Sequence, residues 1–479
     1  MKFSPEQIRA FERLSQDRNP LHLHEDYARR SPFGRPVVYG VCAVLACLGE
    51  WSAGRSFRLG RLKATFRKPL FVGVSYQMRI QDSGERVSLS LERGSVSQLD
   101  LSFTPSHGPV ELSFPATASP ASRQPRRYLP GEELSCPQPY ALVEEALDEA
   151  LNTCGLSRGQ FPLDQLALLC WSSYYVGMEC PGEQALFSSL SIEFGVSGSG
   201  LCQFSSASAR FDERFNLVSI NAEAEDGSRL QLSAFLRPDP VTVSLAEVRA
   251  SLSQSAFWSG RHIFVSGSSR GFGSVLGQAL SLQGARVAYH GRQEFELEPE
   301  IAPQALRLFG DASRADECVR LAGAIAQTWG SLDMCVLNAS PPIQAALFQE
   351  QSGVEWLSFV QQSLACSVEL ARVLLPLLRP GGQLVLVSST YLSLPKPQFS
   401  HYLAAKGALE GWLRGLALEA PQHRFVVARL PRMRTDQTNL PFDLDPALST
   451  VEVAIRLLRQ LEESATGSNY RLLDFQAGH

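Results

Sequence analysis

The sequence lacks several features that would place it outside the soluble proteins of the cytoplasm. Its longest apolar segment, VVYGVCAVLACLGEW from Val37, is shorter than the roughly 18 apolar residues of a membrane-spanning helix. The N-terminal segment MKFSPEQIRAFERLSQDRNP has neither the apolar core nor the small-residue cleavage site of a secretory leader. Ten cysteines occur without a C-x-x-C pair, in a chain too long to need disulfide staples. We therefore expect a cytoplasmic protein with reduced thiols and no membrane partner.

A large excess of charge of one sign is also absent. The 44 basic and 48 acidic residues leave a net charge of -4, so no strong field is available to attract nucleic acid. Clusters of His, Cys and carboxylate residues with metal-ligand spacing are missing, and no metal is expected. What is present is ordinary globular composition, with 44% hydrophobic residues in 479, enough for about three domains of roughly 150 residues each.

Two stretches rich in Pro and Ser, 104–139 and 237–255, divide the chain. We predict a first domain over 1–118, a linker over 119–139, a second domain over 140–240, a linker over 241–257 and a third domain over 258–479. The first two domains share a layout in which an apolar helix pattern meets a glycine turn and then alternating strands. One helix wrapped by an antiparallel sheet, present twice, explains this; the alternative is two unrelated α+β domains.

The third domain alternates short apolar runs such as HIFVSG, RVAYHG and QLVLVSS with helical patterns. Strands of this kind are buried on both faces and predict a parallel, doubly wound sheet, whose ligands bind beyond the carboxyl ends of the strands. After the first strand comes SGSSRGFG, a glycine-rich loop suited to a pyrophosphate at a helix N-terminus. Its expected cofactor-binding residues are Gly267, Ser269, Arg270, Gly271 and Gly273.

After the second strand of this domain comes Ala288-Tyr289-His290-Gly291-Arg292, and no acidic residue stands at the strand end to bind a ribose 2′-hydroxyl. Arg270 and Arg292 can instead bracket a 2′-phosphate, which favours NADPH (NADP+) over NADH. The alternative is that both arginines are solvated surface residues.

Ser389 is followed by Tyr402, and Lys406 stands at i+4 from that tyrosine in a helical pattern, so that the ammonium and the phenol share a helix face. With the glycine-rich loop, these residues resemble the short-chain dehydrogenase/reductase family, which has a Rossmann-type fold. The resemblance implies that Ser389 holds a substrate carbonyl, Tyr402 delivers a proton and Lys406 lowers the pKa of the tyrosine. Tyr391 is a rival phenol, but Pro395 at i+4 offers no cation.

The same resemblance assigns further positions. It implies an adenine contact for Asp311, the family's turn for Asn338 and Ala339, and a nicotinamide carboxamide contact for Thr435. Ser340 replaces the glycine usual in that turn. Ser363 stands where many members carry a helix Asn that supports a proton relay, which raises the question of slowed or rerouted proton delivery.

Near the N-terminus, Asp17 and His22 flank an Asn-Pro turn that can bring a carboxylate and an imidazole together without a metal. The pattern D-x-N-P-x-H, followed by F-G-x-P and Gly40, resembles the MaoC-like R-specific enoyl thioester hydratases, which have a hotdog fold. The resemblance implies that Asp17 and His22 are the catalytic pair, that Asn19 shapes their loop and that the Gly40 N–H receives the thioester carbonyl. Tyr39 stands where members of that family commonly have His. The alternative to a catalytic role for Asp17 and His22 is that Asn-Pro followed by His forms a helix-capping turn.

The second domain has no D-x-N-P-x-H and is expected to complete the sheet and line an acyl tunnel without doing chemistry. His24, His107 and His290 are expected at the surface or in loops, and the cysteines in the core. The predicted architecture is multidomain α+β and α/β, a double hotdog followed by a Rossmann-type doubly wound sheet.

Together the two sites predict a bifunctional ketoreductase–dehydratase that converts a 3-oxoacyl thioester to a 3-hydroxyacyl and then a 2-enoyl thioester, as in polyketide or fatty-acid biosynthesis. The acyl group would arrive on acyl carrier protein or coenzyme A, and both resembled families suggest a homo-oligomer such as a dimer. Two alternatives remain. One is a degradative hydratase/dehydrogenase that prefers NAD, and the other is a partner-binding scaffold in which one domain has lost catalysis.

Overall fold

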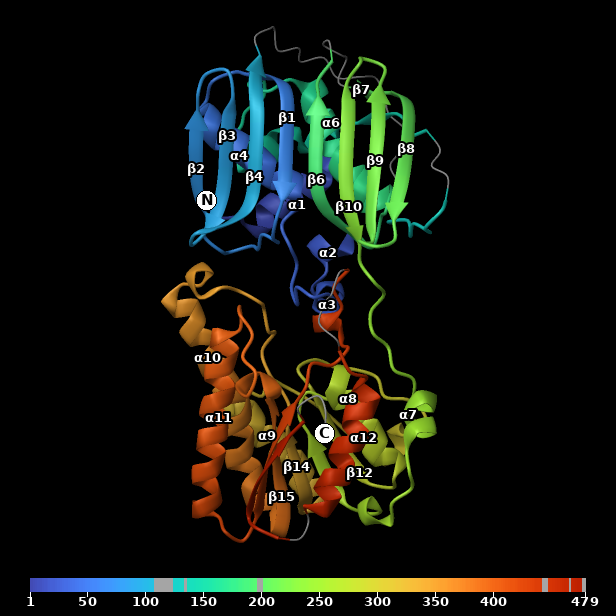
Figure 1. The fold of residues 1–479 in the computed structure, drawn as a ribbon, viewed down its shortest axis with the longest axis vertical. Coiled ribbons are helices and arrows are strands. Elements are labelled where there is room, and N and C mark those ends of the chain that lie inside the picture. Colours follow the sequence, from blue (N-terminus) through green and yellow to red (C-terminus); the bar gives the residue numbers. More distant parts are fainter. Residues whose placement is uncertain (107–123, 133–135, 196–200, 442–446, 465–466, 476–479) are drawn as a thin grey trace. The chain divides into compact units, whose positions relative to one another are not determined.

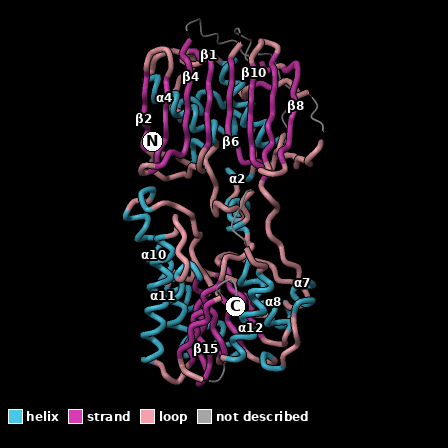
Figure 2. The backbone as a smooth tube through the Cα atoms, in the orientation of Figure 1, coloured by secondary structure: helices cyan, strands magenta, loops and turns pink. Residues whose placement is uncertain are grey.

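The chain folds into two compact units, one formed mainly by Met1–Asp239 and the other mainly by the chain from Pro240 onward (Figures 1 and 2). The computed structural model describes residues 1–106, 124–132, 136–195, 201–441, 447–464 and 467–475. In these ranges, no helix combines the length and the apolar character needed to cross a membrane.

The first unit contains one eight-stranded antiparallel sheet and the helices packed on it. Its helices are α1 (Pro5–Ser15), α2 (Pro20–Leu23), α3 (Glu25–Arg29), α4 (Gly40–Ser52), α5 (Glu144–Thr153) and α6 (Leu163–Tyr174), the last continuing as a π-helical turn, η1 (Tyr175–Glu179). Its strands are β1 (Arg58–Phe66), β2 (Gln77–Asp82), β3 (Val87–Arg93), β4 (Val96–Ser106), β6 (Ala185–Glu193), β8 (Phe204–Asp212), β9 (Leu217–Ala224) and β10 (Arg229–Leu236). Two short strands, β5 (Tyr140–Ala141) and β7 (Leu201–Cys202), pair separately.

The sheet has the order β2-β3-β4-β1-β6-β10-β9-β8, so each half repeats the same arrangement of four strands from the centre outward. β1 and β6 join the halves as antiparallel neighbours, with Leu62 opposite Ile192 and Ala64 opposite Leu190. The two helix-wrapped sheets of the predicted double hotdog are therefore continuous with each other.

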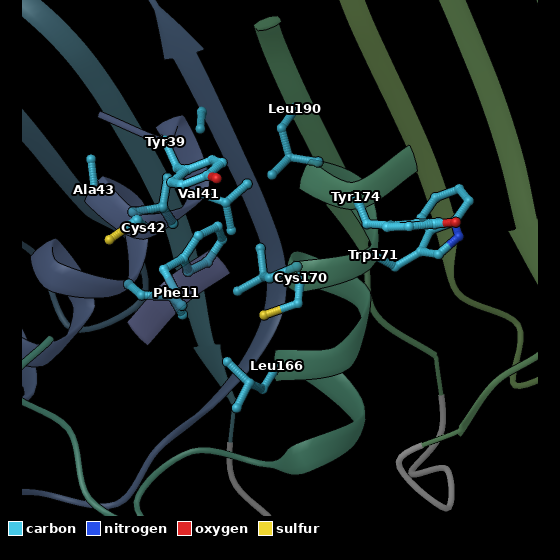
Figure 3. Packing of buried hydrophobic residues seen from close by; sticks show 14 of the residues in the cluster. Phe11, Tyr39, Val41, Cys42, Ala43, Leu166, Cys170, Trp171, Tyr174 and Leu190 are labelled. Atoms are coloured by element: carbon cyan, nitrogen blue, oxygen red, sulfur yellow. The ribbon is translucent and has the colours of Figure 1, made fainter. Parts of the chain in front are cut away.

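The long helices α4 and α6 form the centre of this unit and lie against one face of the sheet (Figure 1). All twelve residues of α6 are buried, as are most of those of α4. Both helices are largely apolar, and the polar Asp164 and Gln165 of α6 bond to Arg58 and Leu59 of β1. Figure 3 shows Tyr39 and Val41 of the first half across from Leu190 and Cys170 of the second. The strands contribute alternate side chains, as in β3, where Val87, Leu89 and Leu91 are buried.

The second unit contains a seven-stranded parallel sheet of order β13-β12-β11-β14-β15-β16-β17. Its strands are β11 (His262–Val265), β12 (Arg286–Gly291), β13 (Leu306–Phe309), β14 (Leu332–Leu337), β15 (Leu378–Ser389), β16 (Arg424–Leu430) and β17 (Tyr470–Asp474). Its helices are α7 (Leu245–Ser251), α8 (Gly271–Leu282), α9 (Ala315–Trp329), α10 (Gly353–Leu374), α11 (Ser400–Glu419) and α12 (Thr450–Glu463). One apolar cluster packs α7, α8 and α12 on the sheet, and another packs α9, α10 and α11, as the predicted doubly wound fold requires.

The stretch 241–257, expected to be a linker, contains helix α7. A capping box formed by Ser244 and Glu247 starts this helix, and Leu245 and Val248 are buried against the core of the second unit. Of the other expected linker, 119–139, residues 119–123 and 133–135 lie outside the described part of the chain, while Tyr128 is buried in the core of the first unit.

The minor expectations for histidines and cysteines have mixed outcomes. His24 is exposed and His107 lies outside the described residues. The expectation for His290 is wrong, because its side chain is only 2% exposed and lies within β12. Nine cysteines are buried, and Cys136 is exposed.

Candidate active sites

His22 lies on α2, a single helical turn that Asn19 caps by accepting a hydrogen bond from Leu21 N at 3.0 Å. The capping turn offered as an alternative to a catalytic loop is thus present, and it carries the histidine. His22 Nδ1 lies 2.8 Å from the Val37 carbonyl oxygen, which can only accept. The proton of the neutral ring is therefore on Nδ1, and Nε2 presents a lone pair. Burial lowers the pKa of His22 to about 4, which keeps the ring neutral.

Asp17 is 2% exposed and accepts hydrogen bonds at both carboxylate oxygens. Ser173 Oγ donates to Oδ2 at 2.7 Å, and Asn19 N donates to Oδ1 at 3.1 Å. Burial raises the pKa of Asp17 to about 7, against the opposing effect of these two hydrogen bonds. Near neutral pH the carboxyl group therefore exists in both forms.

Tyr39 joins these two residues. Its ring lies 3.9 Å from the His22 ring, centroid to centroid, and its hydroxyl donates to the Asp17 carbonyl oxygen at 2.6 Å. Tyr39 is fully buried beside Phe11 (Figure 3). Tyr39, which replaces the His common in the resembled family, therefore contacts both members of the predicted pair.

The second half of the sheet contributes to this site through α6 and the π-helical turn η1. A Cβ at Gly177 would lie 2.4 Å from Asp17 Oδ1, so only glycine lets the turn approach the carboxylate so closely. Asn19 Nδ2 donates to the carbonyl oxygens of Gly177 and Gly182, both at 3.0 Å. Sequence reasoning missed Ser173, because α6 also contains Ala167, Cys170 and Ser172 and no local pattern singles this serine out.

Gly40 is the first residue of α4, where N–H groups have no partner within the helix. A Cβ at this position would lie 2.6 Å from the Phe66 ring, so a larger residue would require that ring to move. The position matches the predicted contact with a thioester carbonyl, and that role stays a prediction.

In the second unit, the glycine-rich loop follows β11 and leads into α8. Gly267 and Gly271 have positive φ angles of 63° and 58°. A Cβ at Gly273 would lie 2.3 Å from the Gly267 carbonyl oxygen, and one at Gly267 would lie 3.0 Å from Ala339 Cα. The loop therefore packs closely against itself and against the turn at Ala339. At the start of α8, backbone N–H groups without a partner in the helix can bind an anion. Ser269 and Arg270 are exposed beside it.

The turn after β14 supports this loop from beneath. Asn338 Nδ2 donates to the carbonyl oxygens of Ser266 and Gly267 at 3.1 and 3.0 Å. Ser266 Oγ accepts from the backbone N–H groups of Asn338 and Ala339. Ser340, in the place of the usual glycine, donates to the Pro341 carbonyl oxygen and does not disturb these contacts.

Asp311 and Arg292 follow β13 and β12, at the same edge of the sheet. Asp311 Oδ1 accepts from Ser313 N and Oγ at 2.9 and 2.7 Å. Burial opposes ionisation, but the Ser313 hydrogen bonds and the charge of Arg292 lower the pKa of Asp311 below its usual value. Arg292 is exposed. Thr435 follows β16 at the start of a short 3-10 turn, where its N–H donates to Thr438 Oγ1.

Ser389 ends β15, and Tyr402 and Lys406 lie on α11. A hydrogen bond joins Ser389 to Tyr402, and it lowers the tyrosine pKa against burial, which raises that pKa to about 12. Lys406 Nζ lies 5.8 Å from the Tyr402 ring centroid and donates to the Val387 carbonyl oxygen at 2.7 Å. Burial lowers the pKa of Lys406 to about 8. The three residues are brought together, with the phenol protonated at neutral pH.

Ser363 and Tyr391 were also singled out from the sequence. Ser363 is buried on α10 and donates its hydroxyl to the Phe359 carbonyl oxygen, one turn earlier, at 2.8 Å. In this hydrogen bond, the hydroxyl proton of Ser363 points to the backbone of α10. Tyr391 packs on Phe399 at 5.3 Å between ring centroids.

A charged network that sequence reasoning missed lies behind Ser389. Glu410, one turn beyond Lys406 on α11, accepts from Ser388 Oγ and pairs with Arg429 of β16 at 2.7 Å. Its charge opposes the lowering of the Lys406 pKa by burial. The end of β15 is thereby fixed to α11.

Comparisons with known proteins agree with this division. Residues 261–439 match the short chain dehydrogenase family, and residues 1–98 match the MaoC like domain family. The chain therefore contains an N-terminal MaoC-like domain and a C-terminal domain similar to the short-chain dehydrogenases. The predicted fusion and both predicted folds are confirmed.

Individual relatives cover about a third of this chain. The chain is 30% identical over 178 residues to glucose 1-dehydrogenase of Gluconobacter oxydans, covering 34% of this chain and 64% of the relative. It is 28% identical over 170 residues to mouse L-fucose dehydrogenase, covering 35% and 62%. The chain thus spans less than two thirds of the length of these relatives. Among solved structures, a putative short chain dehydrogenase from Escherichia coli CFT073, complexed with NADPH, is 25% identical and matches 47% of this chain and 100% of its own, with a TM-score of 0.42.

Proposed function

We propose that this chain reduces a 3-oxoacyl thioester with NADPH and then dehydrates the 3-hydroxyacyl product to a 2-enoyl thioester. The observation that carries the proposal is that two separately assembled sets of residues suit consecutive steps on one acyl chain. The thioester would be carried by acyl carrier protein or coenzyme A, in biosynthesis of the polyketide or fatty-acid type.

For reduction, Ser389 would hydrogen-bond the substrate carbonyl while Tyr402 gives its phenolic proton to the developing alkoxide. Bound NADPH would supply the hydride to the carbonyl carbon. Because burial holds the pKa of Tyr402 near 12, the phenol carries its proton throughout the neutral range. That state is the one needed for reduction, in which the phenol gives up its proton.

For dehydration, Nε2 of His22 would remove the α-proton of the 3-hydroxyacyl thioester, because Nδ1 holds its proton against Val37. The protonated carboxyl group of Asp17 would donate to the leaving hydroxyl, and the N–H of Gly40 at the start of α4 would stabilise the enolate oxygen. A base with a pKa of about 4 and an acid with a pKa of about 7 predict a dehydration rate that is highest between these values.

The test of this function supplies each substrate separately to the purified chain. A 3-oxoacyl thioester should oxidise NADPH, and a 3-hydroxyacyl thioester alone should lose water without cofactor. Absence of both reactions on coenzyme A and on carrier protein would contradict the proposal and favour the scaffold alternative.

Ser173→Ala is expected to slow dehydration about tenfold, because one hydrogen bond that orients Asp17 is lost. That bond lowers the pKa of Asp17, so its removal raises the pKa and moves the alkaline limb of the rate profile to higher pH. The measurement is the dehydration rate from about pH 5 to about pH 9. Ser172→Ala is the matched control, since Ser172 Oγ donates within its own helix, to the Leu169 carbonyl oxygen. An unshifted alkaline limb in Ser173→Ala would contradict this role.

Arg292→Ala is expected to raise KM for NADPH by about tenfold or more while leaving KM for NADH unchanged, because a charge-assisted hydrogen bond to the 2′-phosphate is lost. Arg286→Ala is the matched control: this exposed arginine stands at the opposite end of the same strand. Equal changes for the two cofactors would show that Arg292 does not recognise the 2′-phosphate.

A further inference from the structure

His290 is the buried residue that connects the two loops of the nucleotide site. The Gly267 N–H donates to its Nδ1 at 3.2 Å, and its Nε2 lies 3.0 Å from the Gly310 carbonyl oxygen. An amide N–H can only donate and a carbonyl oxygen can only accept. The two partners therefore fix one neutral form of the ring, with the proton on Nε2.

The backbone of His290 holds the glycine-rich loop as well. Ser268 N donates to the His290 carbonyl oxygen at 2.7 Å, and His290 N donates to Ser268 Oγ at 2.8 Å. On the other side, Gly310 directly precedes Asp311, and the Gly310 N–H donates to the Gly291 carbonyl oxygen at 2.9 Å. One residue of β12 thus contacts the loop after β11 and the loop after β13.

We propose that His290 is a positioning residue for the nucleotide, whose imidazole fastens the pyrophosphate-binding loop to the adenine-side loop and so sets the affinity for the adenosine half of NADPH. The inference rests on the proposed function. It assigns His290 no contact with the nucleotide; the ring acts through Gly267 and Gly310.

The geometry makes the connection sensitive to protonation. A proton on Nδ1 would face the Gly267 N–H, and that hydrogen bond would be lost. Burial lowers the pKa of His290; Asp311 and Glu317 oppose this effect and Arg320 adds to it. Because the folded pKa is depressed, the ring is neutral at neutral pH, and the connection is lost only as the pH falls.

The experiment measures Kd for NADPH and for 2′,5′-ADP, the adenosine half, with the full chain and three variants. In His290→Asn, the amide oxygen stands near the place of Nδ1 and can still accept from Gly267; in His290→Gln, the amide nitrogen stands near Nε2 and can still donate to Gly310. We expect each to weaken binding about threefold, and His290→Leu, which keeps neither bond, about tenfold or more for both ligands. As the pH is lowered over the range in which the chain stays folded, wild-type affinity should fall more than that of His290→Asn, which cannot take up the proton. The 2′-phosphate titrates alike in all variants.

Two other results would overturn the inference in distinguishable ways. If His290→Leu lowers Tm but binds both ligands as tightly as wild type, His290 serves stability alone, and the proposed function stands. If the wild-type chain binds neither NADPH nor 2′,5′-ADP, the inference and the proposed reductase function both fail.

Discussion

Tyr402→Phe is expected to slow reduction of a 3-oxoacyl thioester by about 10²- to 10⁴-fold, the usual contribution of a positioned proton donor. The phenol is the group that Ser389 hydrogen-bonds and the one that carries a proton at neutral pH. Dehydration of a supplied 3-hydroxyacyl thioester should be unchanged, because the Asp17 and His22 pair lies in the other unit. The measurement is the rate of NADPH oxidation beside the rate of water loss.

Tyr391→Phe is the matched control for this variant. Tyr391 packs on Phe399 close to Ser389, and its loss of a hydroxyl should change reduction only a few-fold. In the wild type, reduction should also slow above about pH 8, where Lys406 loses its proton. If Tyr391→Phe abolishes reduction and Tyr402→Phe does not, the assignment of the proton donor is wrong.

Asp17→Asn is expected to slow dehydration by about 10²- to 10⁴-fold while leaving reduction intact, because an amide N–H is too weak an acid to protonate the leaving hydroxyl. The same change should stabilise the fold at alkaline pH. The folded pKa of Asp17 is raised to about 7, so ionising this buried group costs free energy that the amide does not incur. The gain should be on the order of a few kcal/mol near pH 8 and should shrink as the pH falls toward 4.

The stability change is measured as Tm or denaturant midpoint across pH, with Asp148→Asn as control. Asp148 is exposed on α5 and pairs with Arg158, so its replacement should change stability little at any pH. A loss of stability in Asp17→Asn at pH 8 would contradict the account of a buried, partly protonated carboxyl group.

The parts of this molecule that local sequence patterns specify could be predicted. Alternating β-strands and fully apolar helices fix the layers, and the glycine-rich loop sits where a buried strand meets a helix. Asp17 and His22 are close in sequence, so their turn alone brings them near each other. Tyr402 and Lys406 share a helix face for the same reason.

Contacts between distant segments could not be predicted in this way. Ser173 of α6 reaches Asp17 from 156 positions away. The π-helical turn that follows α6 brings Gly177 against the same carboxylate, and no sequence periodicity signals such a turn. His290 looked like a loop residue because a histidine in a strand carries no pattern of its own; its burial depends on polar partners from two other loops. Helix α7 was expected to be linker because its apolar face spans only two turns.

The departures from the resembled families bear on catalysis in different ways. Tyr39 supports the predicted pair by contacting both of its members. The Ser363 hydroxyl donates its proton to the Phe359 carbonyl oxygen of its own helix. In this arrangement, the side chain does not offer that proton to a relay.

The most direct test of the central claim is a single reaction of the wild-type chain with a 3-oxoacyl thioester and NADPH, in which the mass of the acyl product is followed over time. The account predicts a transient gain of two hydrogens followed by loss of one water, giving the 2-enoyl thioester with one NADPH oxidised for each acyl chain reduced. A substrate whose mass does not change, or a hydroxyacyl product that accumulates without losing water in the wild type, would contradict the claim that one chain carries out both steps.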